Sequence, residues 1–102
     1  MRLDLFLKKA RLVHQRRAAK ELCDAGGVLL NGKPAKPSQD VRPGDRLQLQ
    51  LLHQDLEVRI RELPHGNVSR AVAATLIEVL RDQPADRIGR VFGGGEAEEV
   101  GE

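Results

Sequence analysis

Apolar residues recur at helical spacing near the start of the chain. The members of this i, i+3, i+4, i+7 set are Leu3, Phe6, Leu7 and Ala10. The spacing puts these side chains on one face, which predicts a half-buried helix over about residues 2–10. A second helix is predicted over about residues 15–25, and its expected core-facing residues are Ala18, Leu22 and Ala25. The Gly26-Gly27 pair ends it, because glycine tolerates the left-handed cap conformation.

The pattern then changes to short apolar or alternating segments that are typical of strands. Residues 28–30 are followed by Asn31-Gly32, the strongest two-residue signal for a hairpin, since both positions accept positive φ. The return segment over residues 33–38 carries two prolines and is therefore expected at a sheet edge or in a loop. Alternation over residues 47–51 and 56–60 predicts two further strands, with the turn between them at residues 53–55.

Helical spacing returns in the last third of the chain. The apolar positions that predict this third helix, over about residues 68–81, are Val72, Leu76, Val79 and Leu80. The fold class expected is α+β, with two N-terminal helices packed on a small antiparallel sheet and a short C-terminal helix. The expected division is a main domain over residues 1–63, a C-terminal helix within 64–88, and a disordered acidic tail over 89–102, which is rich in glycine and glutamate.

Charge is distributed unevenly along the 102 residues. The formal net charge is +2, but residues 1–50 hold 11 basic and 5 acidic side chains, while residues 51–102 hold 6 and 10. A basic front half indicates an anionic partner, either nucleic acid or a membrane surface, and its alternative is a solvated basic face. A membrane is disfavoured because no apolar run is long enough to cross one and no aromatic-rich face is left over.

Helical phase sorts the basic residues by their expected partners. Asp4 and Lys8 are four residues apart and are expected to pair on the outer surface, as are Arg17 and Glu21. Other cations of the two helices lie on faces away from these acids and are expected to have no acidic partner. The connector between the helices and the hairpin add further cations to the same candidate surface. The resulting candidate RNA-binding residues are Arg2, Lys9, Arg11, Arg16, Lys20, Lys33 and Lys36.

The residues that usually carry catalysis or hold metals are sparse. Three histidines fall on a connector, a turn and a loop, and the single cysteine, Cys23, is expected to be a small, half-buried apolar residue. We therefore expect no enzyme activity, no metal and no cofactor. One cysteine and the absence of a secretory signal fit a reducing, cytoplasmic location. The absence of Trp and Tyr argues against base stacking.

A specific motif runs through the first half of the chain. It reads Arg2-Leu3-Asp4, Phe6-Leu7, Arg11-Leu12, Arg16, Ala19-Lys20, Gly27-Val28, Asn31-Gly32, Lys36-Pro37-Ser38, Val41 and Pro43-Gly44-Asp45. This series resembles the αL-motif RNA-binding domain, which is named for the fourth small-subunit ribosomal protein. Within that superfamily the short length and the N-terminal residues look most like the RqcP family of bacterial ribosome-associated quality control, and next like the heat-shock fifteen-kilodalton family.

The resemblance implies both a binding face and a partner. Its two helices and hairpin would face RNA, with Arg2 and Arg16 as functional residues and Lys20 and Lys36 beside them. It implies 23S rRNA and peptidyl-tRNA on an obstructed 50S subunit as partners, and support of C-terminal tailing beside a NEMF-type factor. We expect the chain to be a monomer. The alternatives are a heat-shock-type 50S recycling factor and an accessory factor in RNA modification or ribosome assembly. A DNA-binding helix-turn-helix is disfavoured, because strands and a hairpin follow the second helix.

Overall fold

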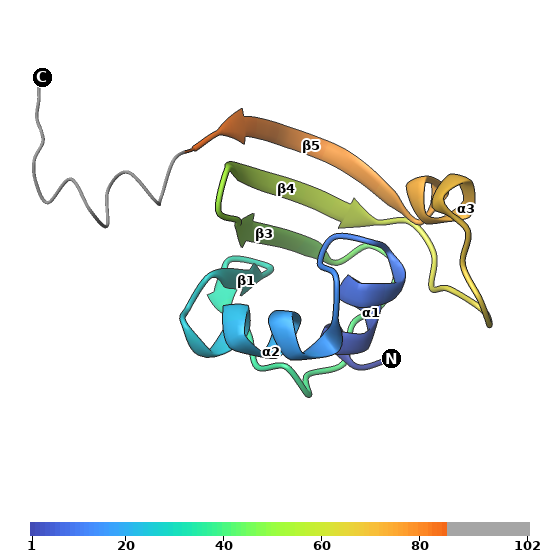
Figure 1. Cartoon of the computed structure of the whole chain (residues 1–102), viewed down its shortest axis with the longest axis horizontal. Coiled ribbons are helices and arrows are strands. Elements are labelled where there is room, and N and C mark those ends of the chain that lie inside the picture. The colour runs from blue at the N-terminus through green and yellow to red at the C-terminus, as the bar shows by residue number, and fades with distance from the viewer. Residues whose placement is uncertain (86–102) are drawn as a thin grey trace, which may run out of the picture.

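The computed structural model describes residues 1–85, which form a helical layer packed on one antiparallel sheet (Figure 1). The elements in chain order are α1 (Leu3–Lys9), α2 (Arg16–Asp24), β1 (Val28–Leu30), β2 (Lys33–Pro34), β3 (Arg46–Gln50), β4 (Gln54–Ile60), α3 (Arg70–Thr75) and β5 (Ile77–Pro84). The strands are ordered β2-β1-β3-β4-β5. The predicted α+β class is confirmed, and the predicted acidic tail lies outside the described residues.

Helix α1 begins without a side-chain cap, because a neighbouring loop supplies the missing acceptors. The N–H groups of Leu3 and Asp4 donate to the carbonyls of Gln39 and Pro37, at 2.8 and 3.0 Å. These are two of the N-terminal donors that a helix cannot satisfy internally. The start of α1 is therefore fixed in position by the loop that joins β2 to β3.

Helix α2 turns a different face to the core from the one predicted. Ala19 and Cys23 are buried, whereas the expected Ala18 and Leu22 are only partly buried and Ala25 is exposed. The prediction was wrong for Ala25 and missed Ala19 and Cys23, whereas Leu22 does pack against the core from the side of this face. The small side chains at the buried positions let α2 lie close to the core.

Two glycine-containing turns form as predicted. After α2, Gly26 has φ +80°, and the N–H groups of Gly26 and Gly27 return to the carbonyls of Cys23 and Leu22. This pair of bonds is the Schellman arrangement that closes many helices.

The second turn joins β1 to β2. Asn31 and Gly32 both have positive φ, +51° and +85°, as a two-residue hairpin turn requires. The Asn31 side chain also accepts a hydrogen bond from the Arg46 N–H at 2.9 Å, which connects this turn to β3. Strand β2 contains Pro34 and lies at the sheet edge, as predicted.

The C-terminal helix is much shorter than predicted. Helix α3 covers only Arg70–Thr75, and the chain continues as β5, which pairs antiparallel with β4 from Ile60↔Ile77 to Gln54↔Pro84. The prediction of helix over 68–81, within a 64–88 segment, was therefore wrong beyond Thr75. Without β5, the outer edge of β4 would leave a row of backbone N–H and C=O groups unpaired. Pairing along β4 outweighs the helical spacing of the sequence.

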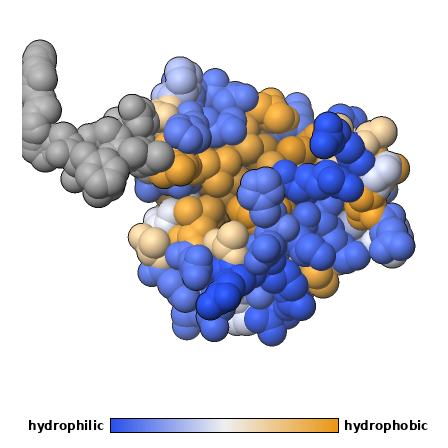
Figure 2. Space-filling view, viewed as in Figure 1, coloured by the Kyte–Doolittle hydropathy of each residue, from blue (hydrophilic) through white to orange (hydrophobic). Residues whose placement is uncertain are grey.

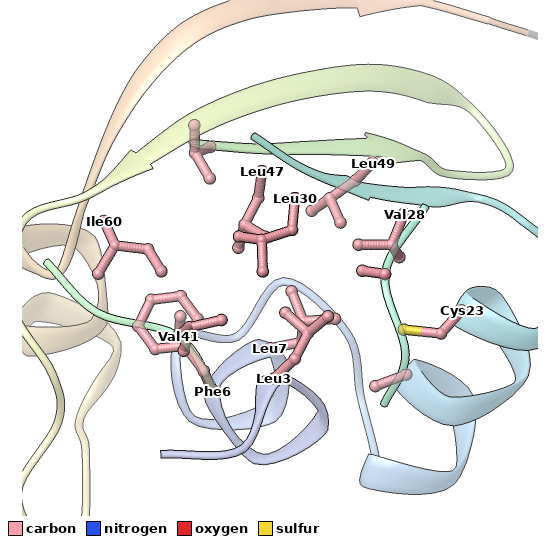
Figure 3. Close-up of a cluster of buried hydrophobic side chains, with 14 of the residues drawn as sticks. Leu3, Phe6, Leu7, Cys23, Val28, Leu30, Val41, Leu47, Leu49 and Ile60 are labelled. Atoms are coloured by element: carbon pink, nitrogen blue, oxygen red, sulfur yellow. The ribbon is translucent and has the colours of Figure 1, made fainter. Parts of the chain in front are cut away.

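The core lies between α1, α2 and the inner face of the sheet (Figure 3). Leu3, Phe6 and Leu7 of α1 are completely buried, and they pack in one cluster with Leu47 of β3 and Ile60 of β4. The helices cover only part of the sheet, since β4 and β5 extend past them (Figure 1). An apolar patch is visible on this side of the molecule (Figure 2), and Val79 of β5 is 55% exposed.

Candidate nucleic-acid interface

A buried carboxylate joins the starts of the two N-terminal helices. Asp4 is only 4% exposed, and its oxygens accept hydrogen bonds from the Leu5 N–H at 2.7 Å and from the Arg2 guanidinium at 3.2 and 3.3 Å. Arg16, at the start of α2, reaches the same carboxylate at 3.4 Å. We call these three side chains the Arg2–Asp4–Arg16 cluster. The expected surface pair of Asp4 with Lys8 is wrong, because Asp4 points to the cluster instead.

The electrostatics of the cluster favour an ionised carboxylate. Burial on its own raises the pKa of Asp4. The hydrogen bonds from Arg2 and from the Leu5 N–H, together with the charges of Arg16 and Arg2, outweigh burial and hold this pKa below its usual value. Asp4 is therefore an anion at neutral pH, and it fixes two cations on one surface.

The two arginines keep much of their surface in solvent. The exposed fraction of the side chain is 52% for Arg2 and 47% for Arg16. The expectation that they lie on faces without an acid is wrong, since both contact Asp4, but the structure does bring them together. One carboxylate beside two guanidiniums leaves a net positive charge. Arginine presents a planar fork of donors that matches the oxygens of a phosphate.

Lys9 and Arg11 lie at the other end of α1. The Lys9 ammonium donates to the Gly66 carbonyl at 2.7 Å, and the Arg11 guanidinium donates to the Val68 carbonyl at 3.1 Å. These partners are neutral, so both side chains keep their full charge. The structure therefore separates Lys9 from Arg2, which the helical phase had placed together.

The remaining predicted cations are exposed. Lys20 lies on α2, Lys33 on β2 and Lys36 in the loop after it, and none of the three forms an ion pair within residues 1–85. The predicted pair of Arg17 with Glu21 is confirmed, with an N–O distance of 3.8 Å. These lysines can extend a basic surface, whereas Arg17 is partly neutralised.

The outer face of the sheet carries a different kind of charge pattern. Glu57 on β4 is hydrogen-bonded by Arg46 and lies 3.9 Å from Arg81, and Arg59 pairs with Glu78 at 3.2 Å. The hydrogen bond from Arg46 holds the pKa of Glu57 below its usual value. The cations of this face are thus paired with acids, whereas those of the helices, their connector and the β1–β2 hairpin include several without an ion pair in residues 1–85.

The described residues contain neither a cluster of metal-ligating side chains nor a membrane-spanning helix. No group of three or more potential metal-ligating side chains occurs in residues 1–85. No helix in that part of the chain is long and apolar enough to span a bilayer.

The sequence did not predict that Asp4 binds both Arg2 and Arg16. A helical wheel describes one helix at a time, and Arg16 belongs to a different helix from Asp4. The spacing Arg2-x-Asp4 was a usable signal, because an acid two residues after an arginine at a helix start is within its reach.

Comparison with known proteins assigns the chain to a family. Residues 1–47 match the model of the S4 domain. The RQC P-site tRNA stabilizing factor of Bacillus subtilis is 39% identical over 83 residues, which are 81% of this chain and 95% of that protein. The chain belongs to this family. A member from Halalkalibacterium halodurans is 37% identical and covers 85% of this chain and 98% of its own length.

A solved structure supports the same assignment. The trimeric structure of Vibrio cholerae heat shock protein 15 superimposes with a TM-score of 0.73 at 29% identity, covering 78% of this chain and 80% of that one. The resemblance drawn from the N-terminal motif is therefore confirmed, both for the quality-control family and for its heat-shock relative.

Proposed function

We propose that this chain is a non-enzymatic RNA-binding protein that acts on the large ribosomal subunit. It contacts 23S rRNA and peptidyl-tRNA there and supports the rescue of stalled nascent chains. The observation that carries the proposal is the Arg2–Asp4–Arg16 cluster, in which two half-exposed guanidiniums are held on one surface. Further support comes from the name that the relatives carry, RQC P-site tRNA stabilizing factor.

The proposed mechanism is positional. The cluster and the exposed lysines of α2 and the hairpin bind phosphates of folded RNA and hold two RNA segments in a fixed relation. Phosphate contacts dominate, because Phe6 is completely buried and the described residues contain no other aromatic ring of the Phe, Tyr or Trp type. Binding is therefore sensitive to RNA shape and to salt rather than to base sequence.

The proposed setting follows from this role. The protein works in the cytoplasm as a monomer, beside a NEMF-type factor that extends the stalled chain. A second candidate function is that of a heat-shock-type 50S recycling factor, and the similarity to Vibrio cholerae heat shock protein 15 favours it. The two candidates share the RNA-binding face and differ in what happens to the nascent chain.

The test is affinity purification of the tagged full-length chain from cells, followed by analysis of the RNA and the nascent chains recovered. We expect 50S particles that carry peptidyl-tRNA. Nascent chains are compared between cells with and without the gene. If deletion of the gene reduces the C-terminal extensions, the quality-control role is supported. If deletion leaves the extensions unchanged but increases the amount of peptidyl-tRNA on 50S particles, the recycling role is supported. Recovery of 30S subunits alone, or of no ribosomal RNA, contradicts both.

A further inference from the structure

A basic groove lies at the end of α1 opposite the Arg2–Asp4–Arg16 cluster. It is a hollow of about 750 Å³ between the α1–α2 connector and the loop that leads into α3. Its charged and polar lining residues are Lys8, Lys9, Arg11, His14, Asn67 and Arg70. We call it the Arg70 groove, after the residue that α3 contributes. Four of these residues, Lys8, His14, Asn67 and Arg70, were not among the residues predicted to bind RNA.

Hydrogen bonds across the groove hold its two walls together. Lys9 donates to the Gly66 carbonyl at 2.7 Å and Arg11 donates to the Val68 carbonyl at 3.1 Å. Because carbonyls are neutral, these bonds fix the two cations without neutralising them. The loop before α3 is thereby attached to the N-terminal helical layer.

The backbone at Arg11 closes helix α1, because the N–H groups of Arg11 and Leu12 return to the carbonyls of Lys8 and Leu7. Arg11 has φ +60°, in the left-handed region where glycine is favoured and a larger residue costs backbone energy. A side chain is therefore present at a position that glycine would occupy with less strain. This helix-ending turn places a cation on the wall of the groove.

The charge of the groove is uncompensated. Lys8, Lys9, Arg11 and Arg70 carry four positive charges, and no Asp or Glu is among the lining residues in the described part of the chain. Neither Lys8 nor Arg70 forms a side-chain hydrogen bond or ion pair within residues 1–85. A concave surface that concentrates one sign of charge attracts ions of the opposite sign.

We propose that the Arg70 groove binds a second segment of RNA backbone, through its phosphodiester groups. This inference rests on the proposed function. A helix of seven residues is about 10 Å long, so the groove and the Arg2–Asp4–Arg16 cluster contact different phosphates. Arg70 and Asn67 lie beyond residues 1–47, the part matched by the S4 domain. The groove therefore gives the C-terminal half of the chain a share in RNA binding.

The first test compares Arg70→Gln with Arg59→Gln, which removes the same charge from the outer face of the sheet. Binding to 50S particles that carry peptidyl-tRNA is measured at several potassium concentrations. We expect Arg70→Gln to weaken binding about 5-fold or more and to reduce the steepness of the log–log salt dependence by about 1. Arg59→Gln should bind like the unmodified chain. Equal binding by the two variants would overturn the inference.

The second test locates the RNA. A hydroxyl-radical probe is attached to Asn67→Cys, which keeps every cation of the groove, and in a control to Arg59→Cys. The native Cys23 is buried, and burial first, then the nearby charges of Asp24 and Asp4, raise the pKa of its thiol to about 11, so it stays unlabelled.

Strand cleavage from position 67 that exceeds cleavage from position 59 supports the groove, and the identity of the cut strand decides between rRNA and tRNA. Protein that binds the particles but cuts no RNA from position 67 overturns the groove alone. Unmodified protein that does not bind the particles at all overturns the proposed function instead.

Discussion

The substitution Asp4→Asn separates the structural role of the buried carboxylate from simple charge. Asp4 accepts hydrogen bonds from three guanidinium N–H groups and one backbone N–H. Asparagine has nearly the same shape, but it loses the negative charge and places an NH₂ donor against one of the arginines. The matched control is Asp40→Asn, because Asp40 is 75% exposed and its only ion pair within residues 1–85 is with the N-terminal amine at 3.6 Å.

The expected loss of stability can be worked from these contacts. Hydrogen bonds to charged groups contribute about 1.5–3 kcal/mol each, but Arg2 and Arg16 are about half exposed and water replaces part of what they lose. We therefore expect a decrease of about 2 kcal/mol in the free energy of unfolding. In a domain of this size, a loss of that magnitude lowers Tm by roughly 8–16 °C. Asp40→Asn should stay within about 0.5 kcal/mol.

The pH dependence provides a second signature. The pKa of Asp4 in the folded chain is below its value in the unfolded chain. The carboxylate therefore contributes fully to the free energy of unfolding above the unfolded-state pKa, and this contribution is lost as the pH falls through the folded-state pKa. The difference in Tm between the unmodified chain and Asp4→Asn should be constant from about pH 7 to pH 5 and shrink below about pH 4. Thermal unfolding followed by circular dichroism across this range measures it.

RNA binding by the same variant tests the positioning role. Asp4→Asn raises the net charge by one, which by itself favours RNA. We nevertheless expect weaker binding, by about 5-fold, because Arg2 and Arg16 lose the group that orients them. Unchanged stability relative to Asp40→Asn, a Tm difference that persists at the lowest pH, or tighter RNA binding would each refute this reasoning.

Three further outcomes are expected. Arg11→Gly removes backbone strain of about 1 kcal/mol but also removes the hydrogen bond to Val68, so the two effects on stability offset each other and Tm should change by less than about 5 °C. RNA affinity should fall about 5-fold because a cation is lost. A large loss of Tm would contradict this. Cys23 should react with iodoacetamide at neutral pH only when urea unfolds the chain, because burial raises the pKa of its thiol to about 11; rapid reaction of the folded protein would contradict the burial. Binding of an rRNA fragment should show a log–log salt slope of roughly −3 to −5, for about four to six phosphates, and a slope near −1 would show that the basic surface is not the main contact.

Local signals account for the parts of the fold that were predicted correctly. The turn at Asn31-Gly32 needs positive φ at both positions, and few other residue pairs accept it. The apolar face of α1 also follows from spacing alone, since Leu3, Phe6 and Leu7 are all buried. In these segments the chemistry of a few neighbouring residues decides the conformation.

Strand β5 was missed because its local signal is ambiguous. Leu76 and Val79 fit helical spacing, but Ile77 and Val79 are β-branched, as strands favour, and lie on either side of the polar Glu78. The deciding factor is the open edge of β4, with which β5 pairs along its length. That edge is a property of the folded sheet, which spacing within one segment does not contain.

The arrangement of the candidate site differs from the one that the sequence predicts. Arg2 and Arg16 do lie together, but the reason is a carboxylate shared between two helices rather than faces without acids. The helical phase also placed Lys9 beside Arg2, whereas the loop before α3 holds Lys9 at the other end of α1. Contacts between segments that are distant in the sequence decide both points.

The most direct test of the central claim compares Arg16→Ala with Arg17→Ala for co-sedimentation with 50S particles that carry peptidyl-tRNA. The two arginines are adjacent, but Arg16 belongs to the Arg2–Asp4–Arg16 cluster, whereas Arg17 pairs with the exposed Glu21. The account predicts that Arg16→Ala stays folded and loses about 1–3 kcal/mol of binding free energy, while Arg17→Ala binds almost normally. Normal binding by a folded Arg16→Ala variant, or a greater loss in Arg17→Ala, would contradict it.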